Sequence, residues 1–104
     1  MSQKVLDYLK KRLPLMTESD IEDTFKQAEK VYEREDGALG VTRIKDYFYR
    51  VVFLAADNKK ARNELLKQAI DEHPECQIIV YERMKYGNKP FYHAVPYLKR
   101  MLAL

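Results

Sequence analysis

Apolar residues recur at the spacing of an α-helix in four stretches of the chain, which proline, glycine and capping residues separate. One stretch, 43–56, is apolar around most of a helical circumference, which places a helix at the centre of the domain. Another, 18–35, has a charged side opposite its apolar stripe, as is typical of an outer helix. The pattern predicts helices over residues 2–13, 18–35, 43–56 and 59–73.

The pattern changes after the fourth of these stretches. Residues 77–84 are rich in β-branched and aromatic side chains, which favours a strand. Gly87-Asn88 forms a suitable hairpin turn, and 90–95 is the returning strand. A short apolar helix over 97–104 ends the chain. We therefore expect an α+β fold, with a compact helical domain, a β-hairpin packed against it and a short C-terminal helix.

Length and composition bound the class of protein. The chain has 104 residues, of which 46% are hydrophobic and 34% charged, so it can build one core. We expect a single domain over 1–104, with an N-terminal helix in 1–16, a core in 17–95 and a C-terminal helix in 96–104. No apolar run is long enough to cross a bilayer, the N-terminus lacks the apolar stretch of a secretory signal, and Cys76 is the only cysteine. These features predict a cytoplasmic protein.

Charge is distributed unevenly along the chain. The net charge is +3, but residues 17–37 hold eight acidic residues against three basic ones. Residues 1–16 and 74–104 each carry a balance of +3. An acidic segment between basic ends indicates one surface that repels a polyanion and another that attracts it. Charges placed wherever a face is solvated would give the same distribution.

The expected order of elements resembles the winged-helix group of helix-turn-helix DNA-binding domains. The likeness covers residues 18–95 and rests on architecture, without a diagnostic motif. It implies that 43–56 is a supporting helix, 59–73 a recognition helix and 77–95 the wing. A recognition helix presents its first turns to the major groove, and here that end reads Asn58-Lys59-Lys60-Ala61-Arg62-Asn63. The resemblance therefore predicts sequence-specific binding of double-stranded DNA by a small transcriptional or replicon-maintenance regulator.

Side-chain chemistry gives each candidate residue a role in this hypothesis. Arg62 and Asn63 can make bidentate contacts with base edges, whereas lysines on the helix and the wing hold phosphates. The predicted DNA-binding residues are Lys59, Lys60, Arg62, Asn63, Lys67, Arg83, Lys85, Tyr86 and Lys89.

Apolar residues at the two ends of the chain favour a homodimer. A small chain gains burial by association, and twofold dimers are the usual form. The two terminal helices could instead pack on each other within one subunit. The predicted interface residues are Leu9, Leu13, Leu98, Met101, Leu102 and Leu104.

The competing hypothesis is a protein-binding adaptor or inhibitor that docks through the acidic helix 18–35. Enzymatic chemistry finds little support, because the chain has no phosphate-binding glycine loop and no paired metal-ligand spacing. His73, Cys76 and His93 could supply three metal ligands, one fewer than a structural zinc site normally has. We expect no catalytic residues, no metal and no cofactor.

Overall fold

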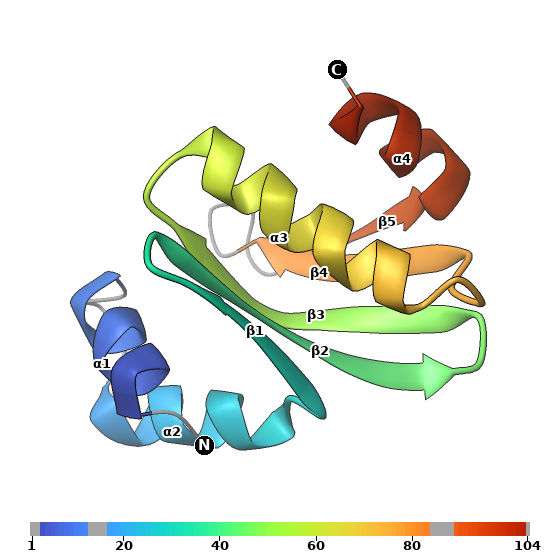
Figure 1. Ribbon diagram of the computed structural model, residues 1–104. Helices are drawn as coiled ribbons and strands as arrows, with labels where there is room; N and C mark the ends of the chain where they lie inside the picture. Colours follow the sequence, from blue (N-terminus) through green and yellow to red (C-terminus); the bar gives the residue numbers. More distant parts are fainter. Residues whose placement is uncertain (1–2, 13–16, 84–88, 104) are drawn as a thin grey trace.

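The computed structural model describes residues 3–12, 17–83 and 89–103, which form four helices and five strands (Figure 1). In chain order these are α1 (Gln3–Arg12), α2 (Glu18–Gln27), β1 (Lys30–Arg34), β2 (Gly37–Lys45), β3 (Phe48–Ala56), α3 (Lys59–Glu72), β4 (Ile78–Arg83), β5 (Lys89–Ala94) and α4 (Val95–Leu102). This arrangement confirms the α+β class.

The five strands form one mixed sheet in the order β1-β2-β3-β4-β5. β1, β2 and β3 pair as an antiparallel meander, and β4 and β5 pair antiparallel. β3 and β4 are parallel, so the chain must return between them, and α3 makes this crossover connection over one face of the sheet. Figure 1 shows α3 and α4 on one face of the sheet and α1 and α2 on the other.

The predicted central helix over 43–56 is wrong, because these residues form the end of β2 and all of β3. β3 is buried on both faces, and a strand of this kind is apolar at nearly every position. The alternation of its side chains between the two faces also shifts, because β3 contains a β-bulge. Gly40 of β2 pairs with Phe53 and Val41 pairs with Val51, so the residue between Val51 and Phe53 has no partner on β2. A continuous apolar run fits a buried helix as well as a buried strand.

The predicted helix over 18–35 is correct only in its first half. Thr17 caps α2, with its hydroxyl accepting the N–H of Asp20 at 3.1 Å. The chain turns extended at Ala28, and the N–H of Glu29 donates to the carbonyl of Val41 at 2.9 Å. Residues 30–34 then join the sheet as β1, and Tyr32 is buried against the α3 side.

Other predicted elements are confirmed within a residue or two. The helix over 2–13 is α1, the helix over 59–73 is α3, the two hairpin strands are β4 and β5, and the final helix is α4. The Gly87-Asn88 turn lies outside the described residues. The winged-helix arrangement is not confirmed, because the segment assigned to its supporting helix is a strand.

Two hydrophobic clusters lie on opposite faces of the sheet. The cluster under α3 and α4 includes Leu39, Leu65 and Ile70, and the cluster under α1 and α2 includes Leu9, Phe25 and Phe53. Each cluster is made by residues distant in sequence, so both helical layers are held to the sheet by apolar burial. Among the described residues, no helix is long and apolar enough to span a membrane.

Candidate nucleic-acid interface

The start of α3 concentrates positive charge on the surface. Asn58 caps the helix by accepting the N–H of Ala61 at 2.8 Å, while Ala61 and Leu65 are fully buried against the sheet. This packing leaves Lys59, Lys60 and Arg62 exposed. The first turn carries no acidic residue. Because the positive end of a helix dipole disfavours cations, these side chains oppose helix stability and together create a surface that attracts anions.

The beginning of β5 lies at the same end of the sheet. β3 and β4 run parallel, so β4 ends at the same end of the sheet at which β3 ends and α3 begins (Figure 1). Arg83 is the last residue of β4, and Lys89, the first residue of β5, is exposed and pairs with it. Lys85 and Tyr86 lie outside the described residues. Two sequence-distant segments therefore bring predicted DNA-binding residues to one end of the molecule.

Two carboxylates at this end, Asp36 and Asp57, have partners of their own. Arg34 holds Asp36 through an Nε–Oδ1 contact of 2.9 Å, and this ion pair, with a further contribution from Lys60, keeps the pKa of Asp36 below its usual value. The Tyr8 hydroxyl donates to Oδ1 of Asp57 at 2.7 Å. Lys60 thus lies within the field of a carboxylate, and Lys59 stands beside it on the exposed first turn.

The remaining residues of the predicted recognition helix are placed differently from the prediction. Asn63 is half-buried, with its amide oxygen 3.4 Å from two nitrogens of Arg62. Lys67 is exposed two turns into the helix, on a side that also carries Glu64 and Asp71. α3 packs against the sheet with α4 beside it on the same face, and a helix-turn-helix arrangement is not confirmed. The cationic first turn of α3 is accessible.

The acidic segment 18–35 does not present one helical face. Glu18 and Asp23 lie on α2, whereas Glu33 lies on β1, and Lys10 neutralises Glu18 at 2.6 Å. The Glu29 carboxylate accepts the hydroxyl of Thr42 at 2.9 Å. The single acidic docking surface expected from the sequence is therefore divided between two elements.

The predicted dimer residues fall into three groups. Leu9 and Leu98 are core residues, 1% and 8% exposed, and Leu102 is partly buried against the core. Met101 is 48% exposed on α4. Leu13 and Leu104 lie outside the described residues. Leu9 and Leu98 are therefore occupied within the chain, but in separate clusters on opposite faces of the sheet, so the two terminal helices do not pack on each other as the intrachain alternative expected (Figure 1).

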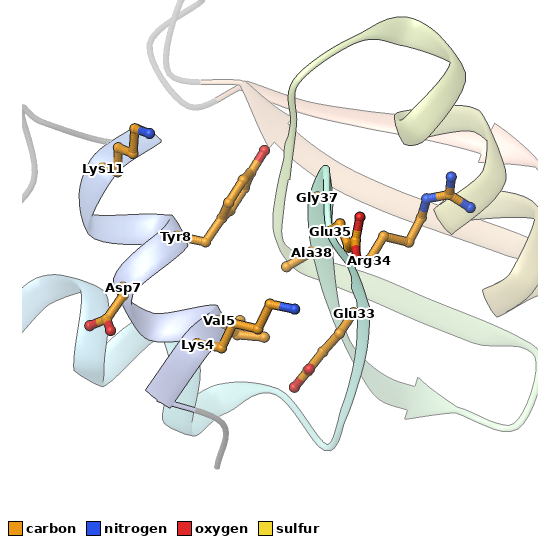
Figure 2. Close-up of a pocket in the computed structure, with 10 residues that line it drawn as sticks. All are labelled: Lys4, Val5, Asp7, Tyr8, Lys11, Glu33, Arg34, Glu35, Gly37 and Ala38. Carbon is orange, nitrogen blue, oxygen red and sulfur yellow. The ribbon is translucent and has the colours of Figure 1, made fainter.

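A cavity of about 250 Å³ lies between α1 and the β1–β2 hairpin (Figure 2). Figure 2 shows the side chain of Tyr8 reaching up from α1, and that of Arg34 extending away from α1. Three cations and three carboxylates line the cavity, so its lining has no net charge. The lining residues are Lys4, Val5, Asp7, Tyr8, Lys11, Glu33, Arg34, Glu35, Gly37 and Ala38. This balance does not select an anionic or a cationic ligand.

A tyrosine–histidine network lies at the other end of α3, and no pattern in the sequence predicts it. Nε2 of His73 is 3.1 Å from the Tyr32 hydroxyl, and Nδ1 is 3.2 Å from the Tyr49 hydroxyl. The Tyr49 hydroxyl donates to the carboxylate of Glu75. The network ties β1 and β3 to the end of α3.

Burial keeps the two tyrosines of this network protonated by raising the pKa of each. Burial, followed by the hydrogen bond to Glu75, raises the pKa of Tyr49 to about 12. Burial also raises the pKa of Tyr32, with Glu72 contributing. The hydrogen bond from Tyr49 lowers the pKa of Glu75. Both tyrosines therefore remain hydroxyl donors at ordinary pH, which suits a structural clamp better than a proton acceptor.

The three residues considered as metal ligands are separated. His93 Nε2 contacts the Tyr81 hydroxyl at 2.9 Å, and the thiol of Cys76 donates to the carbonyl of Ile78 at 3.3 Å. Within the described ranges, no three His, Cys, Asp or Glu side chains come together as a metal site.

Comparison with protein families, with characterised proteins and with solved structures gave no match. The cationic end of the sheet is therefore the candidate site that geometry favours.

Proposed function

We propose that the protein binds double-stranded DNA through the cationic end of its sheet, which we define as Lys59, Lys60, Arg62 and Lys89. One observation carries this proposal: cations from the start of α3 and from the start of β5 lie at the same end of the sheet. An acid-free helix N-terminus that carries cations is suited to phosphate groups, because its free N–H groups and its dipole also attract negative charge.

The approach to DNA differs from that of a recognition helix lying along a groove. Further along α3, Glu64 and Asp71 share the exposed side with Lys67. If α3 lay lengthwise in a groove of the DNA, these two carboxylates would face the DNA phosphates and be repelled by them. The first turn lacks this repulsion, because Glu64, in the second turn, is the first acidic residue of α3. We therefore propose that α3 meets the duplex end-on, with lysines on phosphates and Arg62 closest to the base edges.

The proposal places the protein in the cytoplasm as a small DNA-binding regulator. Its single cysteine is buried and unpaired, in keeping with a reducing compartment. No catalytic step is part of the proposal, since the tyrosine–histidine network is accounted for as a clamp between strands and helix.

The test compares two charge-matched double variants for binding to a labelled duplex of random sequence. Lys59→Ala with Lys60→Ala removes two exposed lysines, both assigned to phosphates, from the cationic end. Lys26→Ala with Lys45→Ala removes two exposed cations elsewhere, one on α2 and one at the far end of β2. Fluorescence anisotropy is recorded between 50 and 200 mM salt, a range over which roughly six or more phosphate contacts change affinity at least 1,000-fold.

We expect the first variant to lower affinity and to make the plot of log affinity against log salt shallower by about 1.8, because each lost phosphate contact contributes about 0.9. The control should keep the parent slope. Equal slopes for both variants, or no binding at 50 mM salt, would exclude this interface. Enrichment of an inverted repeat from random duplexes would add sequence specificity to the proposal.

A further inference from the structure

β5 is an edge strand, and its outer side has free backbone groups. The N–H of Val95 donates to the carbonyl of Gln77 at 2.8 Å, and the N–H of Ile78 donates to β3 through the carbonyl of Tyr47 at 3.0 Å. Backbone direction alternates along a strand, so Tyr92 turns its N–H and C=O away from β4, as do the C=O of Pro90 and the N–H of Ala94. The C=O of Ala94, the N-cap of α4, accepts the first hydrogen bond of that helix. Within the described ranges, nothing pairs with this side. Pro90 sits where its missing N–H costs no bond in the sheet.

Exposed apolar side chains flank this edge on both faces of the sheet. Tyr92 shares a face with Val80, is 64% exposed and lies 6.2 Å from Phe48, ring centre to ring centre. On the other face, Tyr97 and Met101 stand one turn apart on α4 and are 52% and 48% exposed. These three residues make up most of the large exposed hydrophobic side chains of the described chain.

The opposite edge is protected in the way that natural sheets protect their edges. β1 reads Lys30-Val31-Tyr32-Glu33-Arg34, with three charged residues in five. β5 carries such protection only at its start, where Lys89 is followed by Pro90, and its last four residues, Phe91 to Ala94, contain no lysine, arginine, acid or proline. The difference points to β5 as the edge that accepts another strand.

We propose that β5 pairs antiparallel with β5 of a second copy, so that the sheet continues across a twofold axis near Tyr92. With the two Tyr92 residues opposite each other, they exchange two hydrogen bonds. The N–H of Ala94 then meets the carbonyl of Pro90 in the other copy, and the symmetric bond forms as well. The missing N–H of Pro90 faces the carbonyl of Ala94 in the other copy, which as the N-cap of α4 already accepts the first hydrogen bond of that helix.

Charge and area favour a second copy in this register. Antiparallel pairing moves the two Lys89 residues to opposite ends of the paired strands, whereas parallel pairing would place them side by side. At about 200 Å² for a tyrosine, the exposed parts of Tyr92 and Tyr97 supply roughly 230 Å² per copy. That is more than a third of the roughly 600 Å² per partner that a small specific interface needs, and Met101 and the strand edge add to it.

The dimer does not depend on the proposed function, and its test contains no DNA. Light scattering after size exclusion, over a range of protein concentrations, should give twice the mass of the chain. Ala94→Pro removes the outward N–H, and Ala94 already has a φ of −68°, which proline accepts. Ala94→Ser is the matched control, because it keeps the N–H and is a good cap for α4.

We expect Ala94→Pro to raise the dissociation constant roughly 30-fold, from the loss of two hydrogen bonds per dimer, and Ala94→Ser to leave it unchanged. The circular dichroism spectra of both variants should match the parent. Parent protein that is monomeric throughout, or Ala94→Pro that is folded and still fully dimeric, would overturn the proposal.

A cross-link tests the register. Directly opposed, hydrogen-bonded residues have Cα atoms about 5.5 Å apart, within the range of a disulfide. Tyr92→Cys should give a covalent dimer on mild oxidation. Tyr47→Cys, also at an exposed tyrosine but in the turn before β3 and separated from β5 by β4, should not. The native Cys76 is buried. A dimer that cross-links through neither position, or only through position 47, would contradict this interface.

Discussion

Lys59 stands where the proposed function and the stability of the fold conflict. It is exposed in the first turn of α3, a turn without an acidic residue. A cation there opposes the helix dipole, and an anion there supports it, by 0.3–1 kcal/mol in each case. Lys59→Glu should therefore raise the free energy of unfolding by about 1 kcal/mol. For a domain of this size, that corresponds to an increase in Tm of about 4–8 °C.

The same substitution should weaken DNA binding. It removes one phosphate contact and sets a carboxylate against the DNA, so the salt dependence should become shallower by about 0.9 and affinity at low salt should fall. A more stable protein that binds less well is not the result of general damage to the fold. Urea denaturation and fluorescence anisotropy on the same preparation measure both effects.

Lys26→Glu is the matched charge reversal. Lys26 lies in the last turn of α2, where a cation supports the helix dipole. Its reversal makes the same change in net charge but should lower stability by a similar amount and leave the salt dependence of DNA binding unaltered. If Lys59→Glu destabilises the protein, the dipole argument fails. If both variants lose affinity equally, binding follows net charge and not the cationic end of the sheet.

Two further predictions concern the sheet. A Cβ at Gly40 would lie 2.4 Å from Cε1 of Phe53, whose ring stacks on Phe25. Gly40→Ala should therefore lower the free energy of unfolding, measured by urea denaturation, by about 1–3 kcal/mol. Adding Phe53→Leu, which removes the ring, should recover part of this loss. Tyr49 has its pKa raised to about 12 from an ordinary 10.0, so the stability that distinguishes the parent from Tyr49→Phe should be full below about pH 10 and vanish as the pH rises towards 12. The lowered pKa of Glu75 has the opposite sign, since the stability it contributes is present above its ordinary 4.5 and is lost on acidification, and Tyr49→Phe should flatten that acid limb. Unfolding curves collected from pH 3 to 12 for parent and variant would refute the network if their difference stayed constant.

Elements with local signals could be predicted from the sequence. α3 has a capping Asn58, an apolar stripe and a proline, Pro74, just beyond its end. β4 is a β-branched and aromatic run. In each case the local preference and the tertiary position agree, which is why the sequence pattern predicted the structure correctly.

The errors arose where burial erased the period. β3 is covered on both faces, so its apolar run has neither a two-residue nor a 3.6-residue repeat that could decide between strand and helix. Tyr32 fell on the helical stripe that begins at Ile21, but its position also suits the alternation of β1. Tertiary pairing with β2 decided the outcome, and the sequence of 30–34 alone does not contain it.

The two corrected elements also explain how the candidate site is assembled. If 43–56 were a helix, α3 would pack on it, and the relation of Lys59 to the later hairpin would depend on an interhelical angle. Because 48–56 is a strand parallel to β4, α3 must run back over the sheet before β4 begins. The start of α3 and the end of β4 therefore lie at the same end of the sheet. The residue chemistry of the cationic end could be predicted from sequence, whereas its convergence follows from one parallel strand pair. Any change that preserved Lys59 and Lys89 but broke that pair would therefore disperse the site.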